Sequence, residues 1–85
     1  MSKSGVLTMK HGYISLDSVS TGRKVVVKSI DGKGWVKRLY QLGITPGAVL
    51  EVIANNAHGP VIVRVGDTEV AIGRGIAKRI FVEVN

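Results

Sequence analysis

The sequence predicts an all-β domain, a small barrel of about five strands with one short helix inserted after the first strand. Runs rich in β-branched residues recur at intervals of about 8 to 12 residues between glycine-containing turns, a spacing typical of sandwiches and barrels. A single segment places its apolar residues at helical spacing. The chain has 85 residues, which is enough for one domain and too few for two.

The first predicted strand is residues 25–30, VVVKSI, which ends at a turn-forming Asp-Gly pair. Residues 1–12 are polar, interrupted by glycine and without periodicity. We therefore expect them to form a flexible N-terminal leader before a domain that covers residues 13–85. Between leader and strand, residues 15–22, SLDSVSTG, are interpreted as one irregular turn.

The predicted helix lies between two glycines, at positions 32 and 43. Its apolar residues recur at helical spacing: Trp35, Val36, Leu39, Tyr40 and Leu42. Gly43 stands where the end of a helix needs a left-handed residue, and Pro46-Gly47 prevents continuation and forms a turn. Gly43, Pro46 and Gly47 are therefore expected to have a structural role.

Four further strands complete the predicted barrel. Residues 49–54 form one strand, residues 61–65 and 68–72 form a hairpin, and residues 79–84 form the last strand. Residues 73–78 between them are interpreted as a short turn or a single helical turn. A sheet this short and curved avoids open edges by closing on itself, which favours an SH3-like barrel. An OB-type barrel is the alternative, because it also has five strands and one helix.

The composition limits the possible functions. The absence of cysteine excludes disulfides and thiolate metal sites. The net charge of +6 is compatible with nucleic acid, an anionic membrane surface or an acidic protein as partner, and the basic residues are too scattered to choose among them. No apolar run approaches the roughly 20 residues of a membrane span, and the start of the chain lacks a signal-peptide core. We therefore expect a cytoplasmic protein without a membrane span.

The chemistry of an enzyme is also not indicated. No GxxxxGK[ST] run is present to cradle phosphate, so direct nucleotide binding or hydrolysis is not expected. The two histidines, His11 and His58, have no acidic neighbour at ligand spacing, and the six acidic residues form no close pair for general acid and base catalysis. The sequence thus predicts a binding domain with no catalytic residues, no metal site and no cofactor.

The helix is the most informative element for binding. At about 100° per residue its apolar residues span an arc of roughly 160°, while Lys37, Arg38 and Gln41 occupy the other side. This stripe is wider than the packing of one short helix on a small barrel requires. Either part of it is a docking surface, or all five apolar side chains pack inward.

Nucleic-acid-binding barrels usually interleave aromatic stacking residues with basic residues on their strands. This chain has only four aromatic residues, and two of them lie on the predicted helix: Tyr13, Trp35, Tyr40 and Phe81. A small basic nucleic-acid-binding barrel is therefore the weaker alternative, and it rests on charge more than on layout.

One stretch, WVKRLYQLGITPGAVLEVI at residues 35–53, resembles the FeoA family, whose members carry a helix with an R-L-x-x-L-G-[ILM]-x-P-G ending followed by an apolar strand. The resemblance continues on both sides. SLDSVSTGRKVVVKSI at residues 15–30 is similar to the opening turn and first strand of the family, and residues 58–84 are similar to its closing half. The separated segments agree in order and spacing from Tyr13 to Val84.

The resemblance implies a cytoplasmic SH3-like accessory or regulatory protein of ferrous iron uptake. Its implied partner is the cytoplasmic GTP-binding domain of the membrane transporter FeoB, and self-association stays open. The same module occurs as the C-terminal domain of DtxR-type metal-dependent repressors, so a stand-alone repressor-type domain is a further alternative.

Site residues follow from the resemblance and the helix pattern together. The resemblance implies that Leu39 contacts the partner, with Leu42 as the core anchor. The other residues expected to bind the partner lie on the same helix: Trp35, Lys37, Arg38 and Tyr40.

Overall fold

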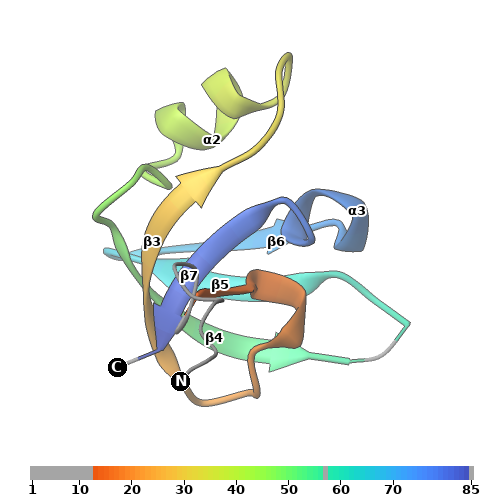
Figure 1. The fold of residues 1–85 in the computed structure, drawn as a ribbon. Coiled ribbons are helices and arrows are strands. Elements are labelled where there is room, and N and C mark those ends of the chain that lie inside the picture. Colours follow the sequence, from red (N-terminus) through yellow and green to blue (C-terminus); the bar gives the residue numbers. More distant parts are fainter. Residues whose placement is uncertain (1–12, 57, 85) are drawn as a thin grey trace, which may run out of the picture.

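A computed structural model describes residues 13–56 and 58–84, which form one curled antiparallel sheet with short helical segments (Figure 1). The strand order is β2-β7-β3-β4-β5-β6. In chain order the elements are β2 (Tyr13–Ser15), the 3-10 turn η2 (Leu16–Ser18), β3 (Lys24–Ile30), α2 (Val36–Gln41), β4 (Val49–Asn55), β5 (Val61–Val65), β6 (Thr68–Ile72), α3 (Arg74–Ala77) and β7 (Ile80–Val84). The expected leader, residues 1–12, lies outside the described residues.

The all-β class is confirmed, and the described sheet differs from the prediction in two details. The described sheet has six strands, because residues 13–15, just before the expected turn, form the additional strand β2. The helix α2 therefore follows the second strand of the described part and not the first. Strand β2 pairs with β7, with Ile14 opposite Val82. A strand of three residues shows no readable alternation, and this one depends on a partner about 70 residues away in the sequence.

The alternation of the longer strands builds the core. Every second residue faces inward, and these positions are buried: Val25 and Val27, Leu50 and Val52, Val61 and Val63, Val70 and Ile72, Ile80 and Val82. Within residues 13–56 and 58–84 no polar or charged side chain is buried. Shifts of register in β3 and β4 accompany the curvature of the sheet around this core.

Two glycines and a pair of backbone hydrogen bonds define the turn after α2. Gly43 has a φ of 90° and Gly47 a φ of 95°, values that favour glycine. The Gly47 N–H donates to the carbonyl oxygen of Val27 at 2.7 Å, and the Val27 N–H donates to the carbonyl oxygen of Ala48 at 2.9 Å. Pro46 lies in the same exposed turn. These bonds fix the end of α2 to β3 and place the helix at one end of the barrel (Figure 1).

Candidate functional site

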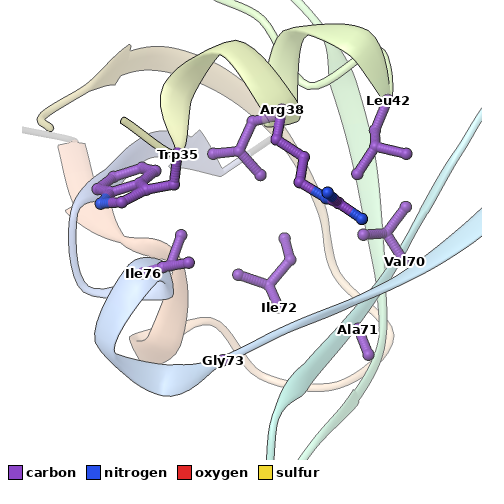
Figure 2. A pocket seen from close by; sticks show the side chains of 9 residues that line it. Trp35, Arg38, Leu42, Val70, Ala71, Ile72, Gly73 and Ile76 are labelled. Atoms are coloured by element: carbon purple, nitrogen blue, oxygen red, sulfur yellow. The ribbon is translucent and has the colours of Figure 1, made fainter. Parts of the chain in front are cut away.

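An apolar cleft of about 140 Å³ lies between α2 and the segment that runs from β6 into α3 (Figure 2). Its lining comes from three places in the chain: Trp35, Arg38, Leu39 and Leu42 at α2, Val70, Ala71 and Ile72 on β6, and Gly73 and Ile76 at α3. Arg38 is the one charged residue of this lining. A cleft of apolar walls with a single cation is suited to binding and offers no acid, base or nucleophile for catalysis.

The β6 side of the cleft follows from the place of that strand in the sheet. Strand β6 stands at the end of the strand order and pairs with β5 within the described residues. Val70 and Ile72 face the core, whereas Ala71 between them is exposed. Because successive side chains of a strand point to opposite faces, a cleft lined by all three runs along the edge of the strand.

Trp35 closes one end of the cleft, where its indole ring lies near Ile76 (Figure 2). The ring is half-buried, and it covers the backbone of Gly32. A Cβ atom added at Gly32 would overlap with the six-membered part of the indole. Gly32 therefore leaves the space that the tryptophan needs.

Gly32→Ala is expected to displace the indole and to shift the fluorescence emission of the protein, because Trp35 is its single tryptophan. The matched control is Gly75→Ala, where a Cβ atom meets nothing within 4 Å and the emission should stay unchanged. Emission spectra of the two variants beside the parent protein measure this. An unchanged spectrum for Gly32→Ala would show that the position of the Trp35 indole does not require glycine at position 32.

The positions of Leu39 and Leu42 are the reverse of those expected. Both leucines line the cleft, but Leu39 is 6% exposed and belongs to the core, while Leu42 is 38% exposed. Leu39 lies near the middle of the apolar stripe, and the middle of a stripe faces the barrel when a single short helix packs on it. Leu42 lies at the edge of the stripe and at the C-cap of α2, after the last helical residue.

The structure divides the other residues expected to bind a partner into two groups. Trp35 and Arg38 line the cleft, whereas Lys37 and Tyr40 do not. Tyr40 is 48% exposed at the far edge of the stripe. Arg38 was expected on the opposite side of the helix, but its long side chain extends from α2 toward Val70 (Figure 2).

Sequence reasoning missed the second wall of the cleft, formed by Val70, Ala71, Ile72, Gly73 and Ile76. The alternation of β6 predicts which side chains face the core. It carries no signal that an edge strand lies beside a helix that ends about 27 residues earlier in the chain. The small apolar Ala71 at an outward position is the one hint that this edge is used.

The charges near the cleft leave Arg38 without a carboxylate. Elsewhere on the surface, Arg64 pairs with Glu69 at 3.0 Å and with Glu51 at 3.4 Å, and Lys28 pairs with Glu83 at 3.3 Å. Among residues 13–56 and 58–84, no hydrogen bond or ion pair involves the Arg38 guanidinium. Within the described part of the chain, the cleft therefore presents a positive charge without a counterion beside apolar walls.

Residues 13–56 and 58–84 contain neither a cluster of metal ligands nor a membrane-spanning helix. No three His, Asp or Glu side chains gather there as ligands of a metal ion would. His58 is exposed in the loop before β5, and His11 lies outside the described residues. None of the described helices has the length and apolarity needed to cross a bilayer.

A curled antiparallel sheet with an apolar cleft beside its edge strand defines a small β-barrel domain with a candidate binding site. The FeoA domain model matches residues 14–84, and the chain belongs to the FeoA family. It is 48% identical over 63 residues, 73% of this chain and 76% of the relative, to a protein of Methanocaldococcus jannaschii described as an Fe(2+) transport protein A.

Solved structures of the family have the same fold. An iron uptake regulatory protein, also called FeoA, superimposes with a TM-score of 0.79 at 33% identity, over 86% of this chain and 97% of that one. FeoA of Stenotrophomonas maltophilia, solved in complex with zinc and described as a prokaryotic SH3 domain protein, gives a TM-score of 0.73 at 26% identity over 82% and 89% of the two chains. The SH3-like barrel is thereby confirmed over the OB-type alternative.

Proposed function

We propose that this protein is an accessory protein of ferrous iron uptake that binds the cytoplasmic GTP-binding domain of a FeoB-like membrane transporter. The proposal includes a cytoplasmic location for this protein, because the GTP-binding domain of the transporter lies on that side of the membrane. Membership of the FeoA family and the iron-transport names of the relatives support the process. The observation that carries the binding role is the apolar cleft between α2 and β6, with Leu42 exposed in its wall.

The physical basis of binding is the removal of apolar surface from water. Leu42 and Ala71 are exposed on facing sides of the cleft, so a partner side chain placed between them would bury both. Burial contributes about 25 cal/mol for each Å² of apolar surface. The protein acts in this proposal by occupying a surface of the transporter and performs no chemical step.

The test is a binding titration against the isolated cytoplasmic domain of the transporter, with and without guanine nucleotide. Leu42→Asp is expected to weaken binding by at least about tenfold, because a charge would have to enter the apolar interface. Tyr40→Asp is the matched control, since Tyr40 lies on the same helix, is more exposed and does not line the cleft. An equal loss in both variants would place the contact on the outer face of α2.

Salt separates this function from the nucleic-acid alternative. An interface centred on an apolar cleft should lose little affinity between low and physiological salt. Binding dominated by phosphate contacts falls steeply over the same range. The titration is therefore repeated at two salt concentrations, with a single-stranded oligonucleotide as the comparison ligand, and tight salt-sensitive binding of the oligonucleotide alone would favour the alternative.

A further inference from the structure

We propose that the partner enters this cleft as an added β-strand: an extended segment with apolar side chains and a carboxylate, hydrogen-bonded to the free edge of β6 and paired with Arg38. The inference rests on the proposed function, because it describes how the cleft would hold a protein partner. Three observations carry it: the apolar walls of the cleft, and an edge of β6 and a guanidinium of Arg38 that both have no partner within residues 13–56 and 58–84.

The hydrogen-bond pattern of β6 identifies the free edge. Val65 faces Thr68 across the tight turn between β5 and β6, so these two residues form a hydrogen-bonded pair. Alternation then gives Val70 and Ile72 bonds to β5 and directs the backbone N–H and C=O groups of Glu69 and Ala71 away from it. No hydrogen bond joins the backbone of Glu69 or Ala71 to any other element of the described chain.

The free groups of Ala71 lie in the cleft wall, and those of Glu69 lie on the same strand edge, one residue before the lining begins. Val70, Ala71 and Ile72 all line the cleft, so it follows the strand edge for the length of several residues. An extended peptide placed there would bond to Glu69 and Ala71 through its backbone and would direct alternate side chains toward Leu42 and Trp35. Backbone bonds give such a mode its affinity, and the side-chain pockets give it selectivity.

The positive charge of Arg38 indicates which kind of segment the cleft would bind. The cleft lining holds Arg38 and no acidic residue, and Arg38 has no ion-pair partner within residues 13–56 and 58–84. A guanidinium pairs with a carboxylate through two parallel hydrogen bonds. A second copy of this chain, which carries a net charge of +6, would bring repulsion in place of that pairing. An acidic segment of another protein is therefore the occupant that fits.

The experiment uses the ¹⁵N-labelled full chain and a short, end-blocked peptide of alternating valine and glutamate. Binding is expected to slow the solvent exchange of the Glu69 and Ala71 amide protons and to shift their signals. The same peptide with lysine in place of glutamate should bind about tenfold more weakly, the size expected for a charge-assisted hydrogen bond. Arg38→Gln should remove this preference, while Lys37→Gln, which changes the same charge outside the cleft, should retain it.

Several results would overturn the inference. These are equal affinity for the two peptides, binding that leaves the exchange of both amides unchanged, no binding of the glutamate peptide up to millimolar concentration, or slow exchange that depends on protein concentration and so reports self-association.

A parallel titration with the transporter domain separates the strand mode of binding from the proposed function. If Leu42→Asp weakens domain binding while domain binding leaves Glu69 and Ala71 exchange unchanged, the strand mode fails and the proposed function stands. If the peptide binds as expected and the domain does not, the proposed partner is wrong and the strand mode stands.

Discussion

Leu39→Ala is expected to lower the free energy of unfolding by about 2 to 5 kcal/mol, the cost of removing a buried leucine and leaving a cavity. Leu39 is 6% exposed and packs with the core side chains of the barrel. Leu42→Ala should cost less than about 1 kcal/mol, because Leu42 is 38% exposed and its truncation at the wall of an open cleft leaves no enclosed cavity. Urea unfolding of both variants measures the difference.

The pair also separates folding from binding. A domain of this size has a total stability of about 5 to 15 kcal/mol, so Leu39→Ala could leave part of the sample unfolded. Leu39→Met conserves most of the volume and keeps the protein folded for binding measurements. We expect Leu39→Met to bind the partner as the parent does and Leu42→Ala to bind more weakly. Equal destabilisation by the two alanine substitutions would mean that α2 packs both leucines inward.

Most of the fold could be predicted from alternation and turn chemistry. The hairpin of β5 and β6 was predicted with the bounds that the structure shows, because five alternating residues on each side of a Gly-Asp turn specify both strands. The end of α2 just before Gly43 could likewise be predicted, since the left-handed position after a helix favours glycine. Strand β2 could not be predicted, because its three residues are ordered as a strand by pairing with β7.

The candidate site was predicted only in half. The width of the apolar stripe on α2 indicated a surface beyond what packing needs, and Trp35 and Leu42 at its edge do line the cleft. The stripe could not show which of its residues faces the barrel, so the burial of Leu39 and the exposure of Leu42 are the reverse of what was expected. The wall from β6 depends on the curl of the sheet, which brings an edge strand beside a helix distant in sequence.

One polar side chain outside the cleft connects the elements that support its second wall. The Asn55 side-chain amide donates to the carbonyl oxygens of Asp17 at 2.9 Å and Val19 at 2.6 Å. Its side-chain oxygen accepts from Nη1 of Arg74 at 2.9 Å and also from Nη2. Asn55 ends β4, Asp17 belongs to η2 and Arg74 begins α3, so a single residue ties three elements together.

Asn55→Ala is expected to lower the free energy of unfolding by about 2 to 4 kcal/mol, because it removes a charge-assisted bond and leaves two part-buried carbonyl groups without their donor. Asn56→Ala is the matched control: the neighbouring residue has the same side chain, exposed to solvent, and should change stability by less than about 0.5 kcal/mol. Thermal and urea unfolding of both variants give the comparison.

The loss of the bond to Arg74 should also loosen α3, so the NMR signal of Ile76 in the cleft wall is expected to shift in Asn55→Ala and to stay in place in Asn56→Ala. If both variants unfold like the parent protein, the Asn55 bonds are replaced by water at no cost, and the position of α3 does not depend on them.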